Sequence, residues 1–175
     1  LTNMSGVCRY RIEDVVKVTG YYNQSPKITF CYRLNQIANI SGEKVSSLAF
    51  DEMVANLSEA TGDLYIGYSI YADRSTSPGH YKLFLELAED ISDEKKATYN
   101  ALFEEMLCKG NVSVEPLIKS GALGHPEVLF LKKGTYDDYR AVLRSRGANL
   151  NQVKPIKVID NDEKRDFFFS HVVKD

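Results

Sequence analysis

The sequence predicts an α+β fold, in which an N-terminal antiparallel hairpin leads into a small α-β-β-α-β-α sandwich. Two observations predict this architecture. The first part of the chain alternates apolar and polar residues with the two-residue period of a strand. The rest places helical segments, marked by capping residues and glycine stops, between strand segments. With 175 residues, the chain can bury a sizeable core, and we expect helices over one face of a mostly antiparallel sheet.

The hairpin is predicted by two alternating segments, VCRYRIEDVVKVT from residue 7 and KITFCYRL from residue 27, which the turn-rich YYNQSP joins. The second segment carries large apolar side chains on alternate residues: Ile28, Phe30, Tyr32 and Leu34. Such alternation is typical of an antiparallel pair with one face against a core. We therefore expect one face of the hairpin to be buried.

Asp14 lies on the apolar face of the first segment, between Ile12 and Val16. An ionised carboxylate that faces a core costs several kcal/mol unless it is paired or hydrogen-bonded. One explanation is structural: Asp14 pairs with Arg9 or Arg11, or caps a turn. The other is functional: its two oxygens accept hydrogen bonds from the vicinal hydroxyls of a ribose. The periodicity leaves both explanations open.

A structural boundary is predicted at residues 35–42, where a Ser-Gly turn signal interrupts the strand pattern. A helix over about 48–61 follows, capped by Ser46 or Ser47 and stopped by Gly62. We expect this helix to direct four apolar side chains inward: Leu48, Val54, Leu57 and Ala60.

Two strands and a second helix come next. The strands are predicted at about 64–72 and 80–87, and the latter should direct four side chains inward: Tyr81, Leu83, Leu85 and Leu87. Ser92 caps the second helix, which ends at Gly110.

The last elements are a strand near 127–132 and a third helix that ends at Gly147. Thr135 is expected to cap this helix, with Asp138 as its capping-box partner. The tail beyond it mixes a charge run with the consecutive phenylalanines at 167–169. We expect these phenylalanines to dock on the body of the fold.

Composition excludes several classes of function. The net charge of −2 and the pI near 6.0 argue against a dedicated nucleic-acid or membrane-surface binder. No apolar run is long enough to cross a bilayer, and no signal peptide opens the chain. Three scattered cysteines and three scattered histidines favour a cytoplasmic protein with reduced thiols and predict no metal site. Because the sequence begins at Leu1 and enters a strand almost at once, we expect it to be cut from a longer protein.

Three basic residues beside loop signals are candidates for chemistry. Lys44 closely follows Gly42 of the predicted hinge, and Lys154 precedes a proline after the third helix. A loop lysine is a mobile point charge suited to a phosphate that carries developing charge, although most loop lysines only keep a surface soluble. His80 is either a strand-edge residue or a general base.

Tyrosines on the two central strands leave a second class of function open. An aromatic sheet surface can stack the bases of single-stranded RNA. Core packing is the competing explanation, and no basic patch accompanies these tyrosines. A non-catalytic α+β module that binds a ligand or RNA is therefore the alternative to an enzyme.

Several motifs together resemble one enzyme family. YRIEDVVKVTGYYNQSPKITFCYRLN is similar to a segment of the auxin-responsive acyl acid–amido synthetases, which are adenylate-forming enzymes. Four further segments resemble that family in the same order: ISGEK, STSPGHYKLFLEL, KKGTYDDY and GANLNQVK. The resemblance covers about 8–158, and it is to the last third of such an enzyme.

The resemblance implies an activity for the complete enzyme. The family uses ATP and magnesium to activate a carboxylic acid as an acyl-adenylate, which the amine of an amino acid then attacks to give an amide. ATP and magnesium would be bound mainly by an N-terminal part that this sequence lacks. The implied partners are therefore a small carboxylic acid, an amino acid and the chain's own N-terminal domain, with no nucleic acid and no membrane. The fragment alone is expected to be inactive.

The resemblance also assigns residues. Asp14 matches a ribose-binding aspartate, Arg33 matches an arginine beside the nucleotide, and Lys44 matches a lysine that approaches the phosphates. Lys154 matches a second such lysine and is the catalytic candidate, while Tyr22 and His80 are further candidates. No metal ligand is assigned. A lysine ammonium placed beside the phosphates would lower the barrier to adenylation by offsetting the negative charge that develops there.

The chain departs from the family pattern at two of these sites. Glu13 stands where the family has a glycine, directly before Asp14. After Lys154, Pro155-Ile156-Lys157 replaces a family segment in which the proline is followed by an arginine.

The resemblance divides the chain into four parts. Residues 1–36 correspond to the terminal strands of the large adenylating domain, and 37–42 to the hinge. Residues 43–159 correspond to the small C-terminal domain, and 160–175 form a C-terminal tail.

Overall fold

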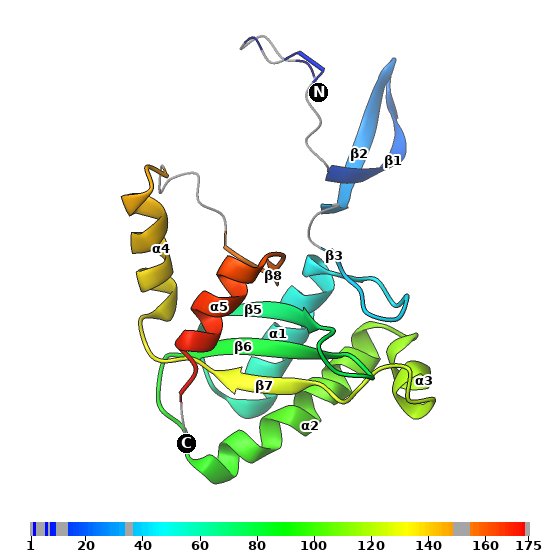
Figure 1. Ribbon diagram of the computed structural model, residues 1–175. Helices are drawn as coiled ribbons and strands as arrows, with labels where there is room; N and C mark the ends of the chain where they lie inside the picture. The colour runs from blue at the N-terminus through cyan, green and yellow to red at the C-terminus, as the bar shows by residue number, and fades with distance from the viewer. Residues whose placement is uncertain are drawn as a thin grey trace.

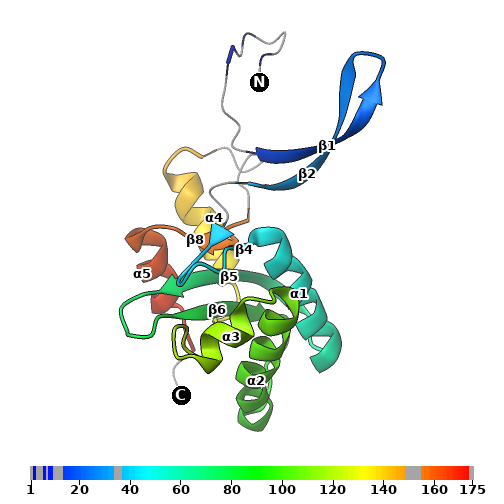
Figure 2. The ribbon, with the colours of Figure 1, turned by 90° about the vertical axis from the view of Figure 1, so that its right-hand side faces the viewer.

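The computed structural model describes residues 2, 6, 8, 9, 14–33, 37–148 and 155–173. Strands β1 (Asp14–Tyr22) and β2 (Ser25–Arg33) form the expected antiparallel hairpin, which stands apart from the rest of the fold in Figures 1 and 2. Asp14 lies opposite Arg33 at its base. Irregularities in the register, between Val15 and Val16 and again between Val18 and Gly20, shift the pairing twice along the hairpin.

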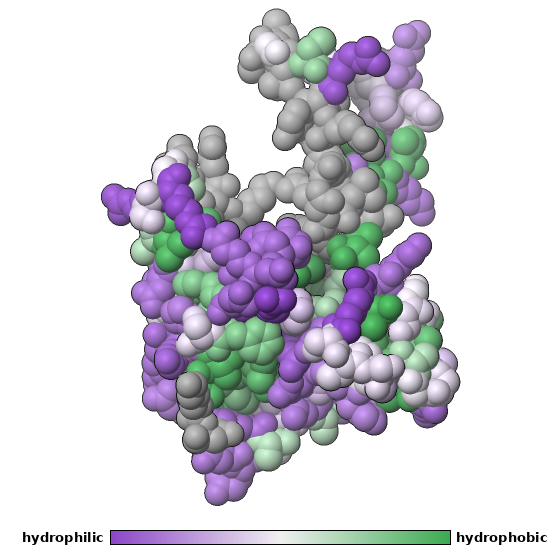
Figure 3. All heavy atoms as spheres, viewed as in Figure 1, coloured by the Kyte–Doolittle hydropathy of each residue, from purple (hydrophilic) through white to green (hydrophobic). Residues whose placement is uncertain are grey.

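The expectation of a buried hairpin face is wrong for this chain. The apolar face consists of two cross-strand pairs whose side chains are between 41% and 58% exposed: Val16 with Phe30, and Val18 with Ile28. Figure 3 shows this hydrophobic surface on the hairpin. Alternation predicted which residues share a face, but burial of that face depends on a second layer, which the described residues do not provide.

A short strand pair opens the body of the fold. Strands β3 (Ile37–Ala38) and β4 (Val45–Ser46) pair antiparallel and enclose a loop of residues 39–44. Helix α1 (Ser47–Thr61) starts directly after β4, and the Ser46 hydroxyl accepts a hydrogen bond from the Ala49 backbone N–H at 3.2 Å. Gly62 ends the helix in a left-handed conformation (φ 74°), which a residue without a Cβ adopts at little cost. Both ends of α1 are therefore as the sequence predicts.

The central sheet has four strands in the order β7-β6-β5-β8. Its middle is the antiparallel pair β5 (Tyr65–Asp73) and β6 (His80–Leu87). Strand β7 (Glu127–Phe130) pairs parallel with β6, and β8 (Val158–Ile159) pairs parallel with β5. The sheet is therefore mixed, with its longest pairing antiparallel.

The described part of the chain after β6 forms four helices: α2 (Asp93–Gly110), α3 (Val114–Lys119), α4 (Thr135–Ser145) and α5 (Asp162–Ser170). The class and the hairpin-plus-sandwich arrangement are as predicted, and the structure adds the β3-β4 pair, α3, β8 and α5. The fifth helix lies in the segment expected to be a tail. None of the helices in the described ranges is long and apolar enough to cross a membrane.

Helices cover both faces of the sheet, which corrects the expectation of a single covered face. On one face, α1 and α2 pack on β5 and β6, and Phe50, Leu57 and Phe103 meet Tyr68 and Leu83 there. A second, smaller cluster joins α4 and α5 to the opposite face: Phe84, Tyr136, Ile159 and Phe168. Phe168 is fully buried, so the predicted docking of the phenylalanines is confirmed, although they dock as part of a helix.

Two local predictions are wrong. Leu48 is exposed and Ala60 points outward, whereas Phe50 and Met53 join Val54 and Leu57 in the core. The helix therefore turns a different stripe toward the sheet from the one predicted. Thr135 is also not the cap of α4, because Gly134 occupies that position at φ 86°. The Thr135 hydroxyl instead donates to the Lys132 carbonyl at 2.6 Å.

Candidate nucleotide and hinge site

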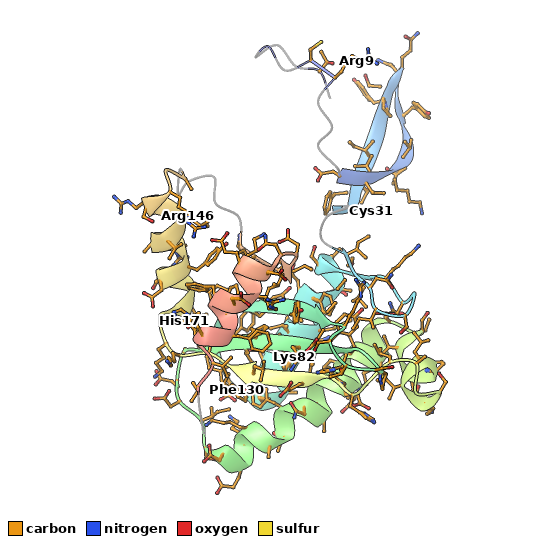
Figure 4. All side chains as sticks on the ribbon, in the orientation of Figure 1. Arg9, Cys31, Lys82, Phe130, Arg146 and His171 are labelled. Atoms are coloured by element: carbon orange, nitrogen blue, oxygen red, sulfur yellow. The ribbon has the colours of Figure 1, made fainter. Side chains whose placement is uncertain are left out.

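Two of the nucleotide-binding candidates lie together at the base of the hairpin. Asp14 begins β1, and Arg33 ends β2 directly opposite it in the antiparallel register. Asp14 is half-buried, and Cys31 lies close by on β2 (Figure 4). The chain leaves the hairpin here and continues toward β3. Residues that the sequence separates by most of the hairpin therefore share its end nearest the body.

Tyr22 lies elsewhere. It is exposed at the tip of the hairpin, opposite Ser25. Eight residue steps along β1 separate it from Asp14, a span of roughly 25 Å at about 3.3 Å per residue. The structure does not group Tyr22 with the candidates at the base.

Lys44 occupies the end of the 39–44 loop, immediately before β4. Its side chain is exposed, and its backbone adopts the left-handed region at φ 50°. A lysine reaches this conformation at a cost that glycine does not bear, and such positions persist only where the surroundings enforce them. The residues around Lys44 must therefore hold the loop in shape.

Glu43 provides that constraint from inside the fold. Its side chain is only 6% exposed. One carboxylate oxygen accepts the Ile40 backbone N–H at 2.6 Å, and the other accepts the Ser41 N–H at 2.7 Å. The hydroxyl of Tyr81, a fully buried residue of β6, also donates to this carboxylate. Three donors thus converge on one buried acid.

The pKa values of this pair follow from the contacts. Burial alone would raise the pKa of Glu43, but the hydrogen bonds from the Tyr81 hydroxyl and the loop N–H groups together hold it below its ordinary value of 4.5. Burial and the neighbouring carboxylate raise the pKa of Tyr81. At neutral pH the pair is therefore a carboxylate that accepts from a neutral phenol.

Lys154 lies outside the described residues, but the structure describes the segment that follows it. The Ile156 carbonyl accepts the Ser69 hydroxyl at 2.6 Å, and the Lys157 carbonyl accepts the Ile70 N–H at 2.8 Å. The Lys157 ammonium lies 2.8 Å from the Asp51 carboxylate. It also lies 4.2 Å from the centre of the Tyr68 ring. Ile156 and Lys157 are therefore fastened to β5 and α1.

His80 is the first residue of β6, so it lies at the end of a strand inside the sheet. Its Nδ1 lies 3.3 Å from the Thr76 hydroxyl, and its Nε2 lies 3.8 Å from the Glu127 carboxylate. Lys82, labelled in Figure 4, lies 2.7 Å from the same carboxylate and 3.5 Å from Asp73. These contacts join β5, β6 and β7 through charge pairs at one end of the sheet.

Sequence reasoning missed the residues that anchor the 39–44 loop and the segment that follows Lys154. Glu43 was visible only as the neighbour of Lys44, and Tyr81 was predicted as core without a polar partner for its hydroxyl. Lys157 was noted only as a departure from a family pattern. A glutamate beside a candidate lysine and a tyrosine on a buried face were the available signals, and neither indicates its partner.

The described residues contain no group of three or more histidine, cysteine or acidic side chains that could hold a metal ion. Two of the candidate side chains, one at the base of the hairpin and one in the 39–44 loop, are of types that can contact a nucleotide. A carboxylate at Asp14 can accept two hydroxyl donors, and Lys44 offers a charge for phosphate.

Two models of one protein family match separate parts of the chain. Residues 1–33 match the GH3 family central domain, and residues 49–163 match the GH3 family C-terminal domain. The boundary between the two matches contains the β3-β4 pair and the 39–44 loop.

Individual relatives of the chain carry names from the same family. The chain is 32% identical over 163 residues to a probable indole-3-acetic acid-amido synthetase, GH3.1, of Arabidopsis thaliana, covering 88% of this chain. It is 31% identical over 171 residues to the 4-substituted benzoates-glutamate ligase GH3.12 of the same plant, covering 91% of this chain. The chain spans 27% and 30% of the length of these two relatives.

A solved structure shares the fold. The GH3.15 acyl acid amido synthetase superposes with a TM-score of 0.78 at 26% identity, over 99% of this chain and 31% of that one. The family matches account for both the hairpin and the body of the fold, and the chain belongs to the GH3 family.

Proposed function

We propose that this chain forms the C-terminal part of an ATP-dependent acyl acid–amido synthetase. The complete enzyme would adenylate a carboxylic acid and then join it to the amine of an amino acid. The observation that carries the proposal is the paired match to the GH3 central and C-terminal domains across a single short linker. The printed names of the relatives, which are amido synthetases and a benzoate–glutamate ligase, supply the reaction class.

The domain boundaries proposed for the enzyme follow the sequence motifs. Residues 1–36 would belong to the large domain, 37–42 to the hinge, 43–159 to the small domain and 160–175 to the tail. The exposed apolar face of the hairpin supports this division. Four half-exposed hydrophobic side chains on one two-stranded ribbon are a surface that a larger domain would cover.

Four of the candidate residues receive a role in this reaction. Asp14 would accept hydrogen bonds from the ribose hydroxyls, and Arg33 would lie beside the nucleotide at the same end of the hairpin. Lys44 and Lys154 would approach the phosphates from the small domain. Adenylation builds negative charge between the α-phosphate and the departing pyrophosphate, so a cation placed there lowers the barrier. Magnesium bound with ATP would neutralise further phosphate charge.

Tyr22 and His80 have weaker support. Tyr22 lies at the far end of the hairpin, and His80 lies among the charge pairs of the sheet. We propose no step for either residue.

The proposal is tested with the protein produced from its complete reading frame. We expect it to exchange radiolabelled pyrophosphate into ATP only when a carboxylic acid substrate is present. The 175-residue chain, assayed in parallel, should show no such exchange, because one short hairpin supplies only part of a nucleotide pocket. A complete protein without acid-dependent exchange across a panel of aryl and alkyl acids would contradict the proposal.

The structure gives no support to the alternative RNA-binding role. Tyr68 and Tyr81 are buried in the core and cannot stack on bases. The other two tyrosines of β5, Tyr65 and Tyr71, are half-buried and make edge contacts with the rings of Tyr68 and Phe169.

The three cysteines are free thiols, which fits the reducing cytoplasm proposed as the protein's location.

A further inference from the structure

The 39–44 loop is tied to the body of the fold by contacts from four separate segments of the chain. Besides the bond from Tyr81 of β6, the Asn111 side chain after α2 donates to the Glu43 carbonyl at 2.7 Å. The Ser41 hydroxyl donates to the Ala122 carbonyl, beyond α3, at 2.6 Å. The Arg74 guanidinium, between β5 and β6, donates to the Asn39 carbonyl. A loop with this many anchors belongs mechanically to the body that supplies them.

Packing adds to these hydrogen bonds at Gly79. A Cβ placed there would lie 3.0 Å from the Ile40 side chain and 2.8 Å from the Asp73 carbonyl. The glycine therefore allows Ile40 to press against the β5–β6 connection. The loop is held by close contact as well as by polar bonds.

Glu43 is the centre of these contacts. Its carboxylate binds the backbone at the start of the loop, and its carbonyl binds Asn111 at the end. Because Tyr81 is fully buried, the carboxylate also ties the loop to the most protected strand of the sheet. Lys44, the next residue, takes its left-handed backbone from this arrangement.

We propose that Glu43 is a positioning residue. It fastens the 39–44 loop to strand β6, so that Lys44 keeps a fixed position within the small domain and moves together with it. This inference rests on the proposed function, because it explains how one phosphate-directed lysine keeps its place during adenylation. It also shifts the boundary of the proposed hinge, because β3 pairs with β4, Ala38 is buried in the core and the 39–44 loop is fastened to β6, so residues from Ile37 onward then move with the small domain. Glu43 itself would not touch the nucleotide, because its carboxylate is occupied inside the fold.

One arm of the test uses this chain and needs no activity. Hydrogen exchange of the Ile40 and Ser41 backbone amides, followed by NMR, reports the two bonds to the carboxylate. We expect Glu43→Ala to speed exchange of both amides at least about tenfold relative to the wild type. Glu59→Ala, which removes an exposed acid on α1, is the matched control and should leave both amides unchanged. Equal exchange in the Glu43→Ala and wild-type chains would overturn the inference.

The second arm uses the complete enzyme and acid-dependent pyrophosphate exchange. Glu43→Ala should lower kcat about tenfold or more while leaving the KM for ATP within about twofold, because a misplaced cation weakens the transition state more than it weakens substrate binding. Lys44→Ala should give the same pattern. The double variant should be no slower than the slower single variant, because both changes remove one function.

The outcomes separate the inference from the proposed function. A wild-type enzyme without exchange activity refutes the proposed function, and the amide measurement still tests the loop. An active enzyme in which Lys44→Ala is slow and Glu43→Ala is normal refutes the inference alone. If Glu43→Ala fails to fold, Tyr81→Phe and Glu43→Gln remove single contacts. Each should then give a smaller change in the same two readouts, and no change in either readout would refute the inference.

Discussion

Removing the Tyr81 hydroxyl should destabilise the fold by an amount that the structure allows us to work out. Tyr81→Phe keeps the ring that packs in the core and deletes one donor to the Glu43 carboxylate. Hydrogen bonds to a charged group contribute about 1.5–3 kcal/mol, and the remaining Ile40 and Ser41 donors still solvate the acid. We therefore expect the free energy of unfolding at pH 7 to fall by about 1.5–3 kcal/mol.

The pH dependence of this loss follows from the pKa of Glu43. Burial raises that pKa, but the hydrogen bonds outweigh burial and lower it, so the folded state binds this proton more weakly than the unfolded state does. The stabilisation from the carboxylate is therefore complete above pH 4.5 and is lost as the pH falls through the folded-state pKa. Tyr81→Phe removes one of the hydrogen bonds that lower this pKa. The difference in the free energy of unfolding between the variant and the wild type should therefore shrink below pH 4.5.

Urea denaturation of both proteins between pH 3.5 and 7, a range chosen to bracket the ordinary glutamate pKa, measures the difference. Tyr21→Phe, which removes an exposed hydroxyl from the hairpin, is the control and should change stability by less than about 0.5 kcal/mol. A Tyr81→Phe loss no larger than that of the control, or one that grows toward acid pH, would refute the reasoning.

Three further variants test the packing. Phe168→Ala should cost about 3–5 kcal/mol in thermal or urea unfolding, because Phe168 is fully buried between α4, α5 and β6; a loss under about 1 kcal/mol would contradict the second cluster. Gly67→Ala should cost about 1–3 kcal/mol, since its Cβ would lie 2.7 Å from the Tyr136 ring, and unchanged stability would mean that this contact is loose. Val18→Lys should leave the isolated chain's stability within about 0.5 kcal/mol but lower the yield of folded complete enzyme, and equal yields would argue against a covered hairpin face.

The sequence was sufficient where a whole element obeys one period. Tyr81, Leu83, Leu85 and Leu87 are all buried as their alternation predicts, because β6 lies in the middle of the sheet. The sequence of α1 did not determine which of its faces is buried. Its apolar residues form two overlapping stripes, and packing against the sheet selects one of them.

Other features depend on contacts between distant segments. The charge run before residues 167–169 concealed helix α5, whose polar first turn faces solvent while Phe168 alone is buried. The carboxylate of Glu43 is stabilised by a hydroxyl on β6, and Asp14 meets Arg33 only through the register of a hairpin. Local patterns carry no information on such pairings between distant segments. The family motifs, in contrast, indicated Lys44 and Lys154 as candidates.

Asp14→Ala in the complete enzyme tests the central claim most directly. Losing the hydrogen bonds that a ligand donates to a charged acceptor costs about 1.5–3 kcal/mol, so acid-dependent pyrophosphate exchange should fall by at least about an order of magnitude. Asp90→Ala, which changes an exposed acid on the small domain, should keep wild-type exchange. Exchange that is active in the wild type and unchanged in Asp14→Ala would contradict a nucleotide site at the base of the hairpin.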